Sequence, residues 1–327
     1  MFADTDIEMI YVSPEGPVED ALKKKEIPYH LIPCLNVKQV QKAIDIVKPD
    51  VIHAHDMRAS VTAALATSLP IISHIHNNNY DSRKISAKSL IYYICSRKFS
   101  HIFWVSESAC NDYRFSSQLK GKSSVLYNVI DDKKIMELAS KGSGNSADVY
   151  DAVYVGRLTY QKNPQRLVHI ISEMKKRKPD VRVAVVGTGD LKEEVESLVH
   201  TMGLDDNIAL LGFQGNPYPF MKNSKAMLMS SRWEGTPMCV LEALALGIPV
   251  VSTPTDGIAD IVHSGVNGYL SDSDDVLAQK AIDIISQNDV FQVFSENARQ
   301  AFEQINDLGS YRKKLLKEYC DATCTNS

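Results

Sequence analysis

The sequence predicts an α/β protein built from two Rossmann-like domains. Short β-rich runs alternate with helical patterns along the whole chain, which is typical of parallel sheets covered by helices. A small polar stretch, Lys141-Gly-Ser-Gly-Asn-Ser146, interrupts this alternation, and the same pattern restarts after it. A length of 327 residues also suits two domains. We therefore expect domains at residues 1–145 and 146–295, followed by a helical tail at 296–327.

The elements of the first domain follow from runs of β-branched and aromatic residues for strands, and from apolar residues at helical spacing for helices. We expect strands at residues 8–12, 29–32, 51–55, 71–76, 101–105 and 124–127. Helices fall between them, at residues 18–25, 37–47, 58–67, 87–98 and 107–114.

The same patterns continue in the second domain. Strands are expected at residues 151–155, 182–186, 208–211, 226–229 and 250–253, with helices at 163–176, 191–200 and 218–222. One more helix begins near Pro237, with Thr236 as its N-cap and Gly247 as the residue that follows its C-cap. From Ser295 onward the chain is again helical, including residues 311–319.

Composition excludes several classes of protein. With 44% hydrophobic and 23% charged residues and a net charge of −4, the chain is of the ordinary soluble type, and nothing favours nucleic-acid binding. No apolar run approaches the roughly 18 residues of a membrane span, and the acidic start MFADTDIEM is unlike a secretion signal. The six cysteines are scattered without zinc spacing, which favours a reduced, cytoplasmic compartment.

The most informative stretch is Arg232–Thr253, RWEGTPMCVLEALALGIPVVST, which holds two carboxylates eight positions apart (242 − 234). Glu234 lies in a Gly/Pro-punctuated loop, and Glu242 is the one charge in an apolar run. Because an unpaired buried carboxylate costs several kcal/mol, Glu242 is either on a solvated helix face or functional. The loop delivers a helix N-terminus, where phosphates bind readily.

Further candidates stand at other strand ends, where open α/β sheets bind ligands. Gly156-Arg157 and Lys162 follow the first strand of the second domain, and these cations suit a diphosphate. Two basic residues in a loop are also common on any surface. Gly187-Thr-Gly189 follows the next strand and resembles the start of a dinucleotide fingerprint, but position 192 is Lys, so the evidence for NAD is poor.

Histidines gather at two strand ends of the first domain. His53 and His55 alternate in VIHAHD, and His74 and His76 alternate in SHIHNNN, so each pair shares a face. A metal site is conceivable, but no acidic partner recurs at a typical spacing. We interpret His76, which three Asn residues follow, as a donor or positioning group rather than a metal ligand.

These segments together resemble family 4 retaining glycosyltransferases of the GT-B fold, in which two Rossmann-like domains face each other across a cleft. In the second half, VYVGRLTYQKNPQRLV, VVGTGDLKEEVESL, SSRWEGTPMCVLEALALGIPVVSTPTDGIADIV and SGVNGYL carry the resemblance in the expected order. In the first half, PDVIHAHDMRA, PIISHIHNN, VSES and VLYNVID match more loosely. The resemblance implies an enzyme that transfers a sugar from a nucleotide-diphosphate sugar with retention, in capsule, exopolysaccharide or lipopolysaccharide-type biosynthesis.

The resemblance also implies roles for single residues. Arg157 and Lys162 would contact the donor diphosphate, and Glu234, first of the Glu-x7-Glu pair, would face the donor sugar. Glu242 would bind the ribose, and His76 would lie near the donor sugar and acceptor. The remaining donor-binding positions are those of the glycine loops and the helix start: Gly156, Gly187, Gly189, Gly235, Thr236, Met238 and Cys239. No cofactor or bound metal is expected, and the tail would cross back to the first domain.

One departure from the family concerns the start of the chain. Family members open with a strand and a Gly-rich loop, whereas MFADTDIEMIYVSPEG resembles the end of the first helix and the second strand. We therefore expect that first strand to be missing. This keeps open a donor-binding but inert partner subunit of another transferase, and a sugar-nucleotide epimerase of the same fold also remains open.

The acceptor is expected to be a saccharide or a lipid-linked saccharide. The segment SRKISAKSLIYYICSRKF combines basic and apolar residues, which could form a helix that contacts the inner face of a membrane. In the alternative, Leu90, Ile91 and Ile94 pack into the core and only the Lys and Arg residues are solvated.

Overall fold

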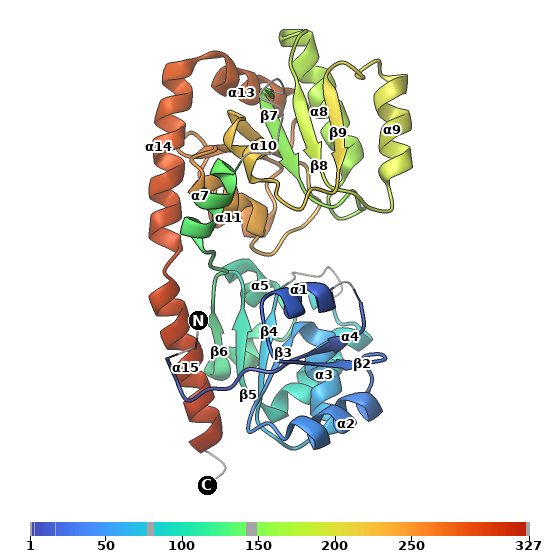
Figure 1. Cartoon of the computed structure of the whole chain (residues 1–327), viewed down its shortest axis with the longest axis vertical. Helices are drawn as coiled ribbons and strands as arrows, with labels where there is room; N and C mark the ends of the chain where they lie inside the picture. Colours follow the sequence, from blue (N-terminus) through green and yellow to red (C-terminus); the bar gives the residue numbers. More distant parts are fainter. Residues whose placement is uncertain (1, 3, 17, 77–81, 142–148, 325–327) are drawn as a thin grey trace. The chain divides into compact units, whose positions relative to one another are not determined.

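The computed structural model of the chain describes residues 2, 4–16, 18–76, 82–141 and 149–324. The chain folds into two compact units. The first unit comprises Met1–Leu126 and Gly309–Ser327, and the second comprises Tyr127–Leu308. Every strand pair in the described parts is parallel, so the predicted α/β class is confirmed (Figure 1).

The first unit holds a four-stranded sheet in the order β3-β4-β5-β6 and a separate strand pair, β1-β2. Its strands are β1 Tyr11–Pro14, β2 Tyr29–Ile32, β3 Ile52–His55, β4 Ile71–Ile75, β5 Phe99–Trp104 and β6 Ser123–Val125. Its helices are α1 Val18–Lys24, α2 Val37–Val47, α3 Asp56–Ala66, α4 Ala87–Cys95, α5 Glu107–Asp112, α6 Ser116–Leu119 and α15 Leu308–Cys324, with 3₁₀ turns η2 Ser96–Lys98 and η3 Lys120–Lys122.

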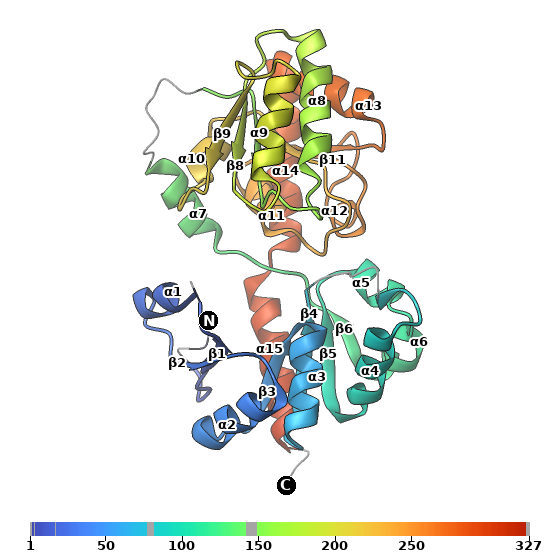
Figure 2. The ribbon, with the colours of Figure 1, turned by 90° about the vertical axis from the view of Figure 1, so that its right-hand side faces the viewer.

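Alternation along the strands gives the four-stranded sheet two apolar faces. Ile71 and Ile75 of β4 belong to a cluster that includes Tyr92 of α4. Ile72, between them, belongs to the opposite cluster, to which α15 contributes Tyr319. The C-terminal segment Gly309–Ser327 is therefore an integral part of the first unit, and α15 runs beside its sheet (Figure 2).

The second unit contains one six-stranded sheet in the order β12-β11-β10-β7-β8-β9. This is the Rossmann order 3-2-1-4-5-6, with β7 as the first strand. The order in which strands are added switches from one side of β7 to the other between β9 and β10, so β7 and β10 are neighbours. Its strands are β7 Ala152–Val155, β8 Val183–Val186, β9 Ile208–Gly212, β10 Ala226–Met229, β11 Val250–Ser252 and β12 Gly268–Leu270. Its helices are α7 Asp132–Ser140, α8 Pro164–Arg177, α9 Lys192–Thr201, α10 Tyr218–Lys222, α11 Met238–Ala245, α12 Asp256–Ala259, α13 Asp274–Ser286 and α14 Asn288–Ile305.

The units divide at Leu126/Tyr127 rather than at the predicted boundary of 145/146. The reason is α7, an element absent from the sequence prediction, which packs against α10 and α11 of the second unit. The predicted linker, residues 141–146, lies outside the described residues apart from Lys141. At the other end, residues 296–308 remain with the second unit, so the part of the tail that belongs to the first unit starts at Gly309.

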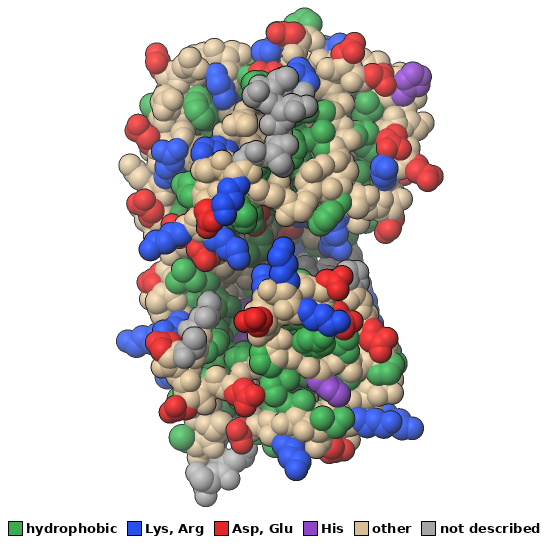
Figure 3. All heavy atoms as spheres, in the orientation of Figure 1, with side chains coloured by type: hydrophobic (Ala, Val, Ile, Leu, Met, Phe, Trp, Pro, Cys, Tyr) green, Lys and Arg blue, Asp and Glu red, His purple; other side chains and the backbone are tan. Residues whose placement is uncertain are grey.

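Three apolar side chains of helix α4 lie on the surface, contrary to the alternative in which they pack into the core. Leu90, Ile91 and Ile94 are 44%, 47% and 53% exposed, whereas Tyr92 and Cys95 of the same helix are buried. The alternative in which Leu90, Ile91 and Ile94 pack into the core is therefore wrong. Elsewhere, cationic and anionic side chains are interspersed on the face shown in Figure 3. No described helix is long and apolar enough to cross a membrane.

Candidate functional site

The candidate donor site lies in the second unit, where the loops after β7 and β10 leave neighbouring strands. At this position the two connections diverge from each other, because β7 leads to α8 while β10 leads to α11. Open α/β sheets form their ligand crevice at such a point. Lys162 stands in the first of these loops and Glu234 in the second.

An ion pair joins the two loops. Lys162 Nζ donates to Glu234 Oε1 at 2.6 Å, and the Ser231 hydroxyl donates to the same oxygen at 2.5 Å. The side chains of Lys162 and Glu234 are only 11% and 5% exposed. The structure thus brings together two residues predicted separately. Ser231 was not among the predicted residues, although its place two residues after the end of β10 offered a weak positional signal.

Further hydrogen bonds hold the two loops in register. The Arg232 N–H donates to the carbonyl of Gln161 at 2.8 Å, and the Gln161 amide donates to the carbonyl of Trp233 at 3.0 Å. The Arg232 guanidinium donates to Asn163 Oδ1 at 2.9 Å. Each loop therefore fixes the backbone of the other beside the ion pair.

The glycines at the ends of β7 and β8 let two loops approach closely. A Cβ on Gly187, where φ is +141°, would lie 1.9 Å from the carbonyl oxygen of Gly156, and one on Gly189 would lie 2.4 Å from that of Leu158. The Leu158 N–H donates to the Thr188 carbonyl at 3.0 Å across the same contact. Packing between loops therefore accounts for Gly187 and Gly189, whether or not a nucleotide also approaches them.

Arg157 differs from Lys162 in being exposed. Within the described ranges, no ion pair engages its guanidinium. Its backbone carbonyl accepts from the Tyr154 hydroxyl at 3.1 Å, which ties the backbone of this loop to the sheet. The cationic end of Arg157 is thus available to an anion, while its main chain is fixed.

Helix α11 begins one residue later than predicted: Pro237 is its N-cap, and Met238 is the first helical residue. Pro237 has extended backbone angles and no side-chain cap, so the prediction of Thr236 as N-cap is wrong. Thr236 is buried, and its carbonyl accepts from the Asn128 amide at 3.0 Å. At the other end Gly247 has φ +72°, which confirms its predicted place after the helix.

The other residues around this helix start differ in exposure. Met238 is 43% exposed, while Cys239 is half-buried. Burial raises the pKa of the Cys239 thiol to about 11, so it is not a reactive thiolate. Gly235 is pressed against the start of α12, because a Cβ on Gly257 would lie 1.3 Å from the Gly235 carbonyl oxygen.

Glu242 is half-buried on α11 and accepts a hydrogen bond from the hydroxyl of Tyr218 on α10 at 3.1 Å. Burial raises the pKa of the Glu242 carboxyl, and the hydrogen bond from Tyr218 partly opposes this shift. Glu242 is therefore not on a fully solvated helix face, and it forms no ion pair with a described residue. Its carboxylate can accept further hydrogen bonds. Tyr218 was missed from the sequence, since no local pattern relates it to Glu242.

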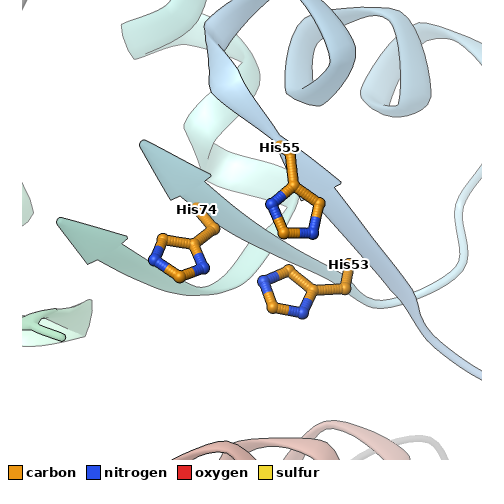
Figure 4. A group of neighbouring side chains, drawn as sticks. All are labelled: His53, His55 and His74. Atoms are coloured by element: carbon orange, nitrogen blue, oxygen red, sulfur yellow. The ribbon is translucent and has the colours of Figure 1, made fainter. Parts of the chain in front are cut away.

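His76 belongs to the first unit and directly follows β4. Its backbone N–H donates to Asp56 Oδ1 at 3.0 Å, and its ring Nε2 hydrogen-bonds His55 Nδ1 at 2.7 Å. Burial lowers the pKa of its imidazole. The three Asn residues that follow it lie outside the described residues. The predicted sharing of one sheet face by His53 and His55 is confirmed, since their rings stack at 4.6 Å (Figure 4).

Comparison with known proteins links these features to one family. The family model "Glycosyl transferases group 1" matches residues 136–301, and "Glycosyltransferase Family 4" matches residues 5–134. An uncharacterized glycosyltransferase of Methanocaldococcus jannaschii is 28% identical over 241 residues, which cover 66% of this chain and 59% of that protein. The poly(glycerol-phosphate) alpha-glucosyltransferase of Bacillus subtilis is 26% identical, over 70% of this chain and 34% of its own length.

Two further similarities extend over more of the relative. The UDP-Gal:alpha-D-GlcNAc-diphosphoundecaprenol alpha-1,3-galactosyltransferase of Escherichia coli is 24% identical over 77% of this chain and 70% of that protein. The crystal structure of Anabaena HepE in complex with UDP-glucose has a TM-score of 0.83 at 19% identity, covering 95% of this chain and 91% of that one. The fold is thus the GT-B type that the sequence predicted. The chain spans about three fifths of the length of the first relative named above and about a third of the length of the second.

Proposed function

The chain belongs to the group 1 glycosyltransferases, and on this premise we propose that it moves a hexose from a nucleotide-diphosphate sugar to a saccharide or lipid-linked acceptor with retention of configuration. It thereby acts in glycan biosynthesis. The observation that carries the proposal is the buried pair of Lys162 and Glu234 at the divergence of β7 and β10. The names of the relatives support the choice of sugar, since they include an alpha-glucosyltransferase and an alpha-galactosyltransferase.

In the proposed reaction the diphosphate displaces Glu234 from Lys162. The Lys162 ammonium and the exposed Arg157 guanidinium then take up the negative charge that grows as the diphosphate leaves. Glu234, still held by the Ser231 hydroxyl, accepts from hydroxyls of the donor sugar. The backbone N–H groups around the start of α11, at Gly235, Thr236, Met238 and Cys239, are proposed to bind the sugar and phosphate, as helix N-termini commonly bind anions.

The nucleotide end of the donor is assigned to Glu242. Its carboxylate accepts from ribose hydroxyls, while the Tyr218 hydroxyl orients it. His76, in the first unit, is proposed as a donor or positioning group for the sugar or acceptor. The hydrogen bond with His55 Nδ1 holds its ring, and the carboxylate of Asp56 holds its backbone N–H. Transfer is proposed to need no bound metal.

A panel of nucleotide-diphosphate sugars with candidate acceptors tests this proposal, with released nucleoside diphosphate and the anomeric configuration of the product as readouts. Glu234→Gln keeps the side-chain volume and is expected to lower kcat at least 100-fold, because an interaction with the reacting sugar is lost. Glu296→Gln, an exposed position on α14, is the matched control and should retain full activity.

Four outcomes would contradict the proposal in distinguishable ways. Full transfer by Glu234→Gln would remove Glu234 from the mechanism. Donor binding without transfer to any acceptor tested would favour an inert partner subunit. Isomerisation of the nucleotide sugar would favour an epimerase. An inverted product would overturn retention alone.

We further propose that α4 rests on a membrane that contains anionic lipid. Leu90, Ile91 and Ile94 project from one surface of the helix at 44–53% exposure, and Ile85 just before it is 68% exposed. Exposed Lys88 on the same helix suits the charge of such a surface. A lipid-linked acceptor would be reached from this position.

Flotation with vesicles of phosphatidylglycerol and phosphatidylcholine tests the membrane contact. The wild type should float with the vesicles, and Ile91→Ser/Ile94→Ser should remain in solution. Ile46→Ser, which alters a 65% exposed residue of α2, is the matched control and should float. Failure of the wild type to float at low salt, or equal flotation of the double variant, would overturn this part.

A further inference from the structure

Four histidines of the first unit form one stack at the carboxyl ends of β3 and β4. His53 and His55 alternate along β3, and His74 lies opposite His55 in the strand register, with His76 two positions further. The rings of His53 and His74 are 5.3 Å apart at an interplanar angle of 9°, and those of His55 and His76 are 5.0 Å apart at 15°. Two neighbouring strands thus present imidazoles to a single volume.

The hydrogen bonds of this stack leave a defined set of nitrogens open. His53 Nδ1 bonds the Tyr319 hydroxyl at 2.6 Å, and His55 Nδ1 bonds His76 Nε2 at 2.7 Å. His53 Nε2 and both ring nitrogens of His74 are buried and have no hydrogen-bond partner among the residues that the structure describes. His74 is fully buried, with 0% exposure. Native proteins rarely bury polar atoms in this way, and each such group calls for a partner.

The chemistry of these rings suits a metal ion. Imidazole nitrogen is a common ligand of zinc, copper and nickel. Because His53 and His74 bury ring nitrogens that have no partner among the described residues, a cation would satisfy the lone pairs of both rings.

We propose that His53, His55 and His74 bind a divalent transition metal of the zinc class. The candidate ligand atoms of the three lie within 4.8 Å of one another (Figure 4). Tetrahedral zinc holds imidazole nitrogens about 3.3 Å apart. Because the rings are stacked nearly parallel, binding requires them to rotate out of the stack until their lone pairs point to one metal position. No carboxylate belongs to this group of ligands, which favours zinc, copper, nickel or cobalt over magnesium and calcium.

The surroundings supply the remaining features of such a site. Tyr319 and His76 occupy the second nitrogens of His53 and His55, which is the arrangement that orients metal-bound histidines. His55 is exposed, so the metal has a path from solvent. Through Tyr319 the site connects β3 and β4 to α15, and we assign it a stabilising role in the first unit. This inference does not depend on the proposed transfer reaction, and it departs from the expectation, drawn from the sequence, of a chain without a bound metal.

Zinc titration of the chelator-stripped full-length chain tests the inference. The probe is zinc chloride in competition with a chromophoric chelator, in a Cys320→Ser/Cys324→Ser background, because these exposed cysteines lie one turn apart on α15 and could bind zinc themselves. We expect one equivalent of zinc, with affinity reduced at least 100-fold by His74→Asn and 10-fold or more by Tyr319→Phe. His200→Asn, an exposed control, should bind as the parent does.

A second measurement makes the result independent of how well the variants fold. X-ray absorption of the zinc-loaded parent protein should show three imidazole nitrogens and no sulfur in the coordination shell, and zinc should raise its Tm but not that of His53→Asn/His74→Asn. No stoichiometric binding by the parent, or a shell without three imidazoles, would overturn the metal site. The stack would then be satisfied by water.

Discussion

Replacement of Lys162 by Met tests the central element of the donor site, the buried ion pair, by its effect on stability. At 2.6 Å and an effective dielectric constant of about 20, the attraction between the two charges is about 6 kcal/mol. Desolvation of two ions at 11% and 5% exposure offsets most of this, so the intact pair contributes little net stability. Removing only the lysine is different, because it leaves Glu234 buried without a counter-charge.

The loss of folding stability in Lys162→Met has an upper bound that depends on pH. A buried carboxylate without a partner can escape by taking up a proton. For an ordinary glutamate, with a pKa near 4.3, protonation at pH 7 costs about 4 kcal/mol, and at pH 5 it costs about 1 kcal/mol. We therefore expect Lys162→Met to destabilise the second unit by about 3–4 kcal/mol at pH 7 and by about 1 kcal/mol at pH 5.

The loss of stability is measured by urea unfolding at both pH values. Hydrogen exchange of peptides from β7, β8 and β10 is the readout, so the measurement reports on the second unit alone. The double variant Lys162→Met/Glu234→Gln removes both charges and should recover most of the stability at pH 7. A loss below 1 kcal/mol at pH 7, the same loss at both pH values, or no recovery in the double variant would refute the argument from burial.

Two further predictions concern other parts of the second unit. Burial raises the pKa of Glu242, so its ionised form destabilises the folded state at neutral pH. Glu242→Gln should therefore raise the Tm at pH 7.5, and this gain should disappear as the pH falls and Glu242 itself becomes protonated. Calorimetry of the same variant should show weaker nucleotide binding. An equal Tm gain at low pH would contradict this. Gly257→Ala places a methyl group 1.3 Å from the Gly235 carbonyl oxygen and should lower stability by more than 3 kcal/mol in urea unfolding, whereas Gly215→Ala, with nothing within 4 Å, should change it by less than 1 kcal/mol.

Local patterns in the sequence were sufficient for most elements of the fold. The expected strand at residues 29–32 and the expected helices at 37–47 and 218–222 have the observed limits. By contrast α7 was missed, because its assignment to the second unit depends on packing against α10 and α11 rather than on a strong pattern of its own. The start of α11 was misplaced by one residue, since Pro is compatible with both the N-cap and the first helical position.

The site was predicted residue by residue but not as an arrangement. Lys162 and Glu234 are 72 positions apart, and their contact requires β7 and β10 to be neighbours, which is a property of the strand order. Local periodicity predicts strands but does not order them. The same limit applies to His53, which lies 266 positions from Tyr319, the residue that fixes its ring. Long-range partners decide whether a histidine is a packed side chain or a ligand.

The two carboxylates of the Glu-x7-Glu pair illustrate how spacing alone underdetermines chemistry. They come from one short segment, yet Glu234 is charge-paired in a loop and Glu242 is hydrogen-bonded by a phenol on a helix. A buried carboxylate that already has a cationic partner is stable before any donor arrives. The proposed displacement exchanges one anion for another at Lys162, and the hydroxyls of Ser231 and the donor sugar then replace the ammonium at Glu234. Glu242 forms no ion pair with any described residue, so its raised pKa marks a group whose burial is unfavourable without a ligand. The proposed donor would relieve that second cost by offering ribose hydroxyls to the carboxylate, which accounts for a lone acidic residue in an apolar helix.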